Sequence, residues 1–304
     1  MQIGVQSGYV FSDDYETGLK MIRDAGFDSV DLNIDELLDV RNMAKTGENP
    51  FFGQDTETII AHYAPFKETA DALGLRFGQM HAPFPVFVPG TDEANRVLFD
   101  AMCKCMAVCH AIDCPYLIVH PIAWSGTHEE EWEKNIAFYS SLIPAAKQYD
   151  VCICLENMFR GRYGHIEDAV CSDFREAAAY IDTLNEIAGE ERFGFCYDVG
   201  HATLLGRNHL RSLRQLGKRL KTLHIHDNDG RGDLHMQPFA YTRGQQYVTD
   251  WDGFLTGLRE IGYDGVLSFE TYHALVYLPQ ELKPVMLSYI AGVGRYFQSV
   301  LTAE

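Results

Sequence analysis

The sequence is short of basic residues and has no long apolar run, and each shortage excludes a class of protein. Without an apolar stretch of about 18 residues, we expect no helix that spans a membrane. Lysine and arginine number 25 against 43 aspartate and glutamate, for a formal net charge of -18. Nucleic-acid binding draws on basic side chains that neutralise phosphates, so we expect neither nucleic acid nor a membrane as a partner.

Paired cysteine motifs and a secretory leader are also missing. None of the 8 cysteines forms a C-x-x-C pair, which argues against a zinc ribbon or a disulfide framework and for free thiols in a reducing compartment. The first residues, MQIGVQSGYVFSDD, have no basic region followed by an apolar stretch. We therefore expect a cytoplasmic protein.

What the chain does contain is a repeated alternation of short apolar runs and amphipathic stretches, which is typical of βα units. No glycine-rich phosphate loop follows the first run, which argues against the rival open, doubly wound sheet, and no linker divides the chain. We predict an α/β fold, a single (β/α)8 TIM barrel over residues 1–304. The predicted strands are Gln2–Gln6, Ser29–Ile34, Arg76–His81, Tyr116–Pro121, Val151–Glu156, Gly194–Asp198, Lys221–His226 and Val266–Glu270.

Helix signals and connection lengths support this assignment. Asp14 can cap a first helix, and Gly26, Gly74 and Gly262 follow apolar residues as helix C-terminal glycines do. Two connections are long, Leu37–Thr56 and Asp227–Thr249. In a barrel both would lie on the catalytic face.

Residues able to bind a metal recur at the carboxyl ends of the predicted strands, which converge on one face of a barrel. They are His81, His120, Glu156, Asp198, His224, His226 and Glu270. A single histidine at such a place is more often structural. Three carboxylates that each close an apolar run are harder to explain without a cation, because converging buried acids repel one another. We predict one divalent metal ion, Mn²⁺, Zn²⁺, Co²⁺ or Fe²⁺.

An ordered series of short motifs carries a family resemblance. The motifs are Met80-His81-Ala82-Pro83, Val119-His120-Pro121, Leu155-Glu156-Asn157, Tyr197-Asp198-Val199-Gly200-His201, Leu223-His224-Ile225-His226-Asp227, Asp233-Leu234-His235 and Phe269-Glu270-Thr271. With these motifs the chain resembles the xylose isomerase-like barrel superfamily. That group holds sugar isomerases and epimerases and is classified with class II apurinic endonucleases.

The resemblance implies which residues form the site. The family's single-metal site corresponds to Glu156, Asp198, His224 and Glu270, with His226 as the alternate ligand because the spacing to an aspartate fits both histidines. Endonuclease relatives use three metals, and the remaining ligand types of that cluster occur here at His81, His120, His201, Asp233 and His235. In a sugar enzyme these side chains, together with His226, are instead expected to contact the substrate.

The resemblance also implies a reaction. Glu156 and Glu270 would move a proton on a carbon next to a carbonyl, through a metal-stabilised enediolate, although both could act as ligands only. Trp124, with Phe84, could form an apolar wall against the sugar-like substrate, and Arg160 could meet an acidic group on it. The alternatives are a lyase or dehydratase acting on an inositol or oxidised sugar derivative, an endonuclease-type phosphodiesterase, and a non-enzymatic barrel. Many members are oligomeric, so a homo-oligomer is also compatible.

Overall fold

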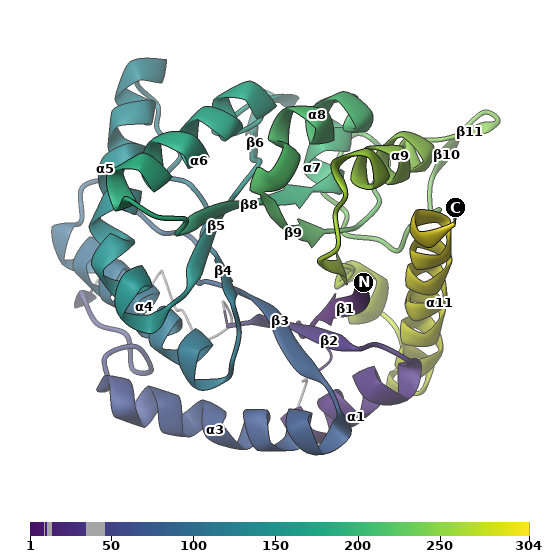
Figure 1. Ribbon diagram of the computed structural model, residues 1–304, viewed down its shortest axis with the longest axis horizontal. Coiled ribbons are helices and arrows are strands. Elements are labelled where there is room, and N and C mark those ends of the chain that lie inside the picture. The colour runs from purple at the N-terminus through teal and green to yellow at the C-terminus, as the bar shows by residue number, and fades with distance from the viewer. Residues whose placement is uncertain (9, 11–13, 35–45, 304) are drawn as a thin grey trace.

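The chain folds into eight parallel strands ringed by helices (Figure 1). The computed structural model describes all residues except 9, 11–13, 35–45 and 304. The spatial order of the strands is β12-β1-β2-β3-β4-β5-β8-β9. The strands are β1 Gln2–Gln6, β2 Ser29–Asn33, β3 Arg76–His81, β4 Tyr116–Ile118, β5 Cys152–Glu156, β8 Phe193–Asp198, β9 Leu220–His224 and β12 Val266–Phe269. The predicted TIM barrel, with a strand at each expected place, is confirmed.

The first and last strands of this order are joined through the backbone of Ile225. Its amide donates to the Ser268 carbonyl at 2.9 Å, and its carbonyl accepts from the Glu270 amide at 3.1 Å. These two bonds connect the end of β9 to the end of β12. The side chains that follow β9 and β12 are therefore neighbours in space.

Strands β2 and β12 end one residue earlier than predicted, and β4 and β9 end two or three residues earlier. Strand β4 stops at Ile118, and Pro121 has no N–H with which to extend the ladder. Strand β9 stops at His224, because the backbone then turns to pair Asp227 with Met236 through bonds of 2.8 and 3.1 Å. His120 and His226 thus lie just beyond their strands.

Most helices of the described residues cover the outside of the barrel (Figure 1). The helices are α1 Tyr15–Ala25, α3 Thr56–Leu73, α4 Asp92–Ala111, α5 His128–Tyr149, α6 Phe174–Ala188, α7 Val199–Leu204, α8 His209–Leu216, α9 Trp251–Ile261, α10 His273–Val276 and α11 Lys283–Thr302, with short 3₁₀ turns η2 Gly217–Arg219 and η3 Gln280–Leu282. Two short ones, α7 and α10, follow strand ends at the face where a hollow opens. Asp14 caps α1, and Gly26, Gly74 and Gly262 end their helices in the left-handed conformation, as predicted.

Two small hairpins interrupt the loops that follow the strands. Strands β6 Phe159–Arg162 and β7 His165–Asp168 pair after β5, and β10 Thr242–Arg243 pairs with β11 Gln246–Tyr247 inside the predicted long connection Asp227–Thr249. Buried Asp227 fastens that connection, since its carboxylate accepts from the Ala240 amide at 3.0 Å and from the Thr249 hydroxyl at 2.7 Å. Residues 37–45 of the other predicted long connection lie outside the described residues.

The barrel interior holds a small apolar cluster, a close contact at a glycine and two buried polar side chains. Most buried apolar residues form one core, whereas Ile118, Cys154 and Cys196 form a separate small cluster, consistent with period-two alternation that points them inward. A Cβ on Gly78 would lie 2.4 Å from the Ser29 hydroxyl, so the chain needs glycine there. Asp31 on β2 and Gln79 on β3 are buried polar residues of the barrel.

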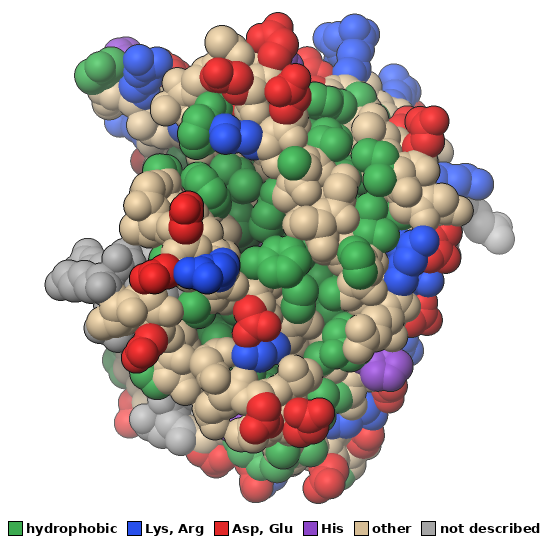
Figure 2. Space-filling model, turned by 90° about the vertical axis from the view of Figure 1, so that its left-hand side faces the viewer, with side chains coloured by type: hydrophobic (Ala, Val, Ile, Leu, Met, Phe, Trp, Pro, Cys, Tyr) green, Lys and Arg blue, Asp and Glu red, His purple; other side chains and the backbone are tan. Residues whose placement is uncertain are grey.

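On the surface, acidic and basic side chains are interspersed. On the flank shown in Figure 2, Lys and Arg are scattered among Asp and Glu and do not gather into one patch. Within the described part of the chain, no helix has the length and apolar character needed to cross a bilayer.

Candidate active site

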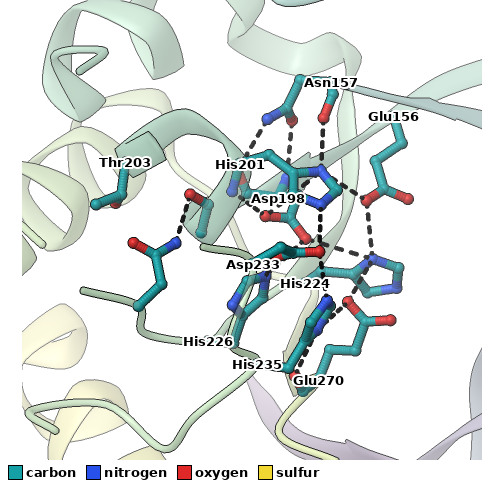
Figure 3. Close-up of polar contacts among 12 residues, drawn as sticks. Glu156, Asn157, Asp198, His201, Thr203, His224, His226, Asp233, His235 and Glu270 are labelled. Carbon is teal, nitrogen blue, oxygen red and sulfur yellow. Dashed lines mark hydrogen bonds and ion pairs between the residues drawn. The ribbon is translucent and has the colours of Figure 1, made fainter. Parts of the chain in front are cut away.

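Three carboxylates from separate strand ends meet around the His224 ring (Figure 3). Its Nδ1 lies 3.3 Å from Glu156 Oε1, 3.4 Å from Glu270 Oε2 and 3.9 Å from Asp198 Oδ2. All four residues are buried, with exposures between 0 and 6%. The sequence-predicted ligand set is thus brought together at one point. Parallel strands achieve this because their carboxyl ends converge.

Several polar atoms of these four side chains lack a hydrogen-bond partner. Among the described residues, neither ring nitrogen of His224 nor Glu156 Oε2 has a hydrogen-bond partner. Burial disfavours the charged form of Glu156, but the imidazoles of His224 and His120 outweigh it and hold the Glu156 pKa well below its ordinary range. Burial likewise opposes ionisation of Glu270, whose pKa His224 and His235 lower. An oxygen-rich set of ionised carboxylates with one imidazole fits a divalent ion.

A first flanking cluster lies on the Glu156 side. His81 Nε2 and His120 Nε2 are 3.0 Å apart, and His120 Nε2 is 3.1 Å from Glu156 Oε2. His81 Nδ1 donates to the Ala82 carbonyl at 2.8 Å, which leaves Nε2 as the acceptor in the neutral ring. Burial, followed by the neighbouring His120, lowers the pKa of His81. These three side chains could also hold a metal ion.

A second flanking cluster contains His201, His226, Asp233 and His235. Asp233 Oδ2 lies 2.9 Å from His235 Nε2 and 3.5 Å from His201 Nε2. Burial opposes protonation of His201, but Asp198 and Asp233 raise its pKa to about 10. Two members of this cluster, Asp233 and His235, come from the long connection Asp227–Thr249.

The structure separates the two candidate histidine ligands. Whereas His224 faces all three acids, His226 Nε2 lies 3.1 Å from Asp198 Oδ2 and 3.8 Å from Asp233 Oδ1, on the second flanking cluster. Close packing fixes His226, since a Cβ on Gly200 would stand 1.9 Å from its Cε1. His226 is thus an Asp198 partner rather than a member of the central set.

A hollow of about 460 Å³ opens above these clusters. Its lining is Gln6, Gly8, Asn33, His81, Phe84, His120, Glu156, Met158, Phe159, His201, Asp233, His235, Glu270 and Tyr272. A larger hollow, about 790 Å³, lies at the amino ends of the strands. We assign the site to the smaller one because the converging acids and imidazoles line it.

Besides His226, two sequence-predicted substrate residues are not part of this lining. The Trp124 ring packs 6.4 Å from Phe87 and beneath Lys134, and the Arg160 guanidinium pairs with Glu131 at 3.5 Å. The apolar wall is instead formed by Phe84, Met158, Phe159 and Tyr272. Trp124 lies in a loop and Arg160 in the β6–β7 hairpin, where side-chain direction depends on packing that local pattern does not encode.

Sequence reasoning missed several lining residues, among them Gln6 and Asn33. Gln6 Nε2 donates to Glu270 Oε1 at 2.7 Å. Its position at the end of the first predicted strand was the available signal, since Glu156 and Glu270 end strands in the same way. Asn157, which follows Glu156 in its motif, also supports the site, because its amide exchanges hydrogen bonds of 2.8 and 2.9 Å with the Asp198 backbone.

Comparison with known proteins agrees with this architecture. The sequence profile of the xylose isomerase-like TIM barrel family matches residues 19–286. Protein MJ1311 of Methanocaldococcus jannaschii is 27% identical over 244 residues, covering 75% of this chain and 78% of the relative. An inosose isomerase of Bacillus velezensis is 26% identical over 219 residues, covering 70% and 74%.

Solved structures share the fold at lower identity. A D-tagatose 3-epimerase-like protein superposes with a TM-score of 0.71 at 19% identity, covering 99% of this chain and 98% of that one. The IOLI protein, solved with a zinc atom, gives a TM-score of 0.67 at 17% identity with the same coverage. Because the family profile spans most of the sequence, the chain belongs to the xylose isomerase-like TIM barrel family.

Proposed function

We propose that this protein is a metal-dependent isomerase or epimerase of a small sugar or sugar derivative. The observation that carries the proposal is the arrangement of Glu156 and Glu270. Both line the same hollow, and each carboxylate approaches His224 Nδ1, at 3.3 and 3.4 Å (Figure 3). Two acids that share one small cavity can act on the same substrate carbon.

The reaction would move a proton on a carbon next to a carbonyl. When held by Glu156, Asp198, His224 and Glu270, a divalent ion supplies Lewis-acid stabilisation of the negative charge that develops on substrate oxygens as the enediolate forms. One glutamate, ionised as the lowered pKa values of both indicate, accepts the proton from carbon, and the other returns a proton after it has itself taken one up. Return to the opposite face of the carbon inverts it, and return to the adjacent carbon isomerises the sugar.

The lining suits a polyhydroxylated substrate. His81, His120 and His201 offer ring nitrogens to hydroxyl groups, while Phe84 and Phe159 offer apolar surface to a sugar's carbon face. Among the described residues that line the hollow there is no lysine or arginine, which favours an uncharged substrate. The names of relatives, inosose isomerase and D-tagatose 3-epimerase-like protein, support the same class.

Two other reactions use the same groups. A lyase acting on an inositol or oxidised sugar would begin with the same proton abstraction. A metal-dependent phosphodiesterase is the second candidate, because the two flanking clusters could each hold a further ion. The net charge of -18 weighs against a DNA substrate.

Metal content separates the proposed sugar enzyme from the phosphodiesterase. Elemental mass spectrometry of the purified protein should find about one divalent ion per chain, and a Glu156→Gln, Glu270→Gln double variant should lose it. Ketoses incubated with the loaded enzyme in deuterated water should then incorporate deuterium at carbon. Close to three ions per chain would favour the phosphodiesterase, and no ion under any loading condition would contradict the proposal.

A further inference from the structure

A fourth acid lies beneath the ligand cluster, on the far side of His224. Asp31, in the middle of β2, is fully buried, and its Oδ2 lies 3.3 Å from His224 Nε2. This contact has ion-pair distance, although its angle falls short of hydrogen-bond geometry. The two nitrogens of one ring therefore face two different sets of carboxylates, Asp31 below and the ligand acids above.

Asp31 is itself held in place from the neighbouring strand. Gln79 is its register partner on β3. The Gln79 amide donates to Asp31 Oδ2 at 2.9 Å and to the Leu223 carbonyl at 3.2 Å. Leu223 immediately precedes His224 in β9. One amide thus ties the acid to the strand that carries the ring.

The cost of this arrangement argues against a purely structural role. A carboxylate in a barrel interior is expensive unless it is paired and hydrogen-bonded. Asp31 Oδ1 has no hydrogen-bond partner among the described residues, and no described lysine or arginine pairs with the acid. If the fold needed only a group to accept from Gln79, the amide of asparagine would serve without the charge.

We propose that Asp31, held by Gln79, is a positioning residue that fixes the orientation of the His224 ring. A half-turn of the ring would replace Nδ1 by a carbon where Glu156, Asp198 and Glu270 converge. Stacking on His81, with ring centres 5.5 Å apart and planes 17° apart, does not distinguish the two orientations. Asp31 does, because it attracts the N–H at Nε2 and so leaves the Nδ1 lone pair toward the acids.

This inference rests on the metal site of the proposed function, and its test measures metal binding without substrate. Zn²⁺ affinity of the whole chain is determined by competition with a chromogenic chelator. We expect Asp31→Asn to weaken Zn²⁺ binding by ~10- to 100-fold, the usual effect of removing the carboxylate partner of a ligand histidine. Asp24→Asn, which removes an exposed acid of α1, is the matched control and should bind as the wild type does.

Thermal unfolding of the metal-free proteins excludes a merely structural effect. Apo Asp31→Asn should be at least as stable as the apo wild type, because a costly buried charge is gone. Gln79→Leu keeps Asp31 but removes its hydrogen-bond donor, and it should also weaken Zn²⁺ binding. Asp31→Glu should bind Zn²⁺ more tightly than Asp31→Asn. These two variants also serve if Asp31→Asn fails to fold.

The outcomes separate this inference from the proposed function. Unchanged Zn²⁺ affinity in Asp31→Asn, or affinity lost only in step with apo stability, would overturn the positioning role and leave the metal site intact. A wild-type protein that binds none of Zn²⁺, Mn²⁺, Co²⁺ and Fe²⁺ would overturn both. Normal Zn²⁺ binding with no activity toward any sugar would contradict the proposed function alone.

Discussion

The amide nitrogen of Gln6, at the end of β1, lies 2.7 Å from Oε1 of Glu270, just beyond β12. Strands β1 and β12 pair in parallel, which brings together residues that are 264 positions apart. The bond leaves the other oxygen of Glu270, Oε2, toward His224 and His235. Gln6 therefore determines which carboxylate oxygen faces the centre of the site.

Replacing Gln6 with leucine should impair turnover more than folding. The Glu270 carboxylate would lose the donor that orients it, and loss of such a supporting contact typically costs ~10- to 100-fold in activity or metal affinity. Deuterium exchange into a substrate ketose measures the effect. Gln2→Leu, at the other end of β1, is the control and should exchange at the wild-type rate. Equal rates in both variants would show that Gln6 does not orient Glu270.

His224→Asn and His226→Asn should behave differently toward metal, although the two histidines are two residues apart. His224 faces three acids, whereas His226 contacts Asp198 and Asp233. We expect His224→Asn to lose more metal affinity than an outer-shell change, which costs ~10- to 100-fold, and His226→Asn to keep about one ion per chain. Elemental analysis after dialysis decides this, and the reverse order would make His226 the ligand.

Stability should fall in mild acid because of His209. Burial lowers the pKa of His209 to about 4, and its ring is bonded to the Tyr197 hydroxyl at 2.7 Å. Between the ordinary histidine value of about 6.5 and about 4, the unfolded chain binds a proton that the native protein does not. His209 should thus add stability above pH 6.5 that is lost toward pH 4, about 3 kcal/mol in all.

The measurement compares wild type with His209→Gln, because other buried histidines titrate as well. Urea unfolding at several pH values between 7 and 4.5 gives the free energy of unfolding for each protein. The wild type should lose more stability on acidification than the variant. Parallel curves for the two proteins would mean that His209 is not the group responsible.

Two glycine-to-alanine changes should have opposite signs. A Cβ on Gly200 would overlap the buried ring of His226, so Gly200→Ala should destabilise the protein by about 1–3 kcal/mol through overpacking. A Cβ on Gly292, inside α11, would meet no other atom within 4 Å, so Gly292→Ala should stabilise the protein by about 0.5–1 kcal/mol. Chemical denaturation measures both. A stable Gly200→Ala protein would imply that His226 can move away.

Several features of the protein follow from the sequence alone, because they depend on local pattern. Alternation of apolar runs and amphipathic stretches predicts the eight strands, and the barrel rule then places Glu156, Asp198 and Glu270 at one face. Cap residues such as Asp14 and Gly26 mark the helix ends for equally local reasons.

Other features were decided only when the barrel closed. Strand alternation points His224 and His226 to the same side, and only the tertiary structure places the first beside the acids of the other strand ends and the second beside Asp233 of the connection after β9. Trp124 and Arg160 follow strand ends, as the residues that line the hollow do. They contact Phe87 and Glu131 instead and do not line it. Contacts of this kind join residues distant in the chain, and their energies depend on distances and angles that no local pattern fixes.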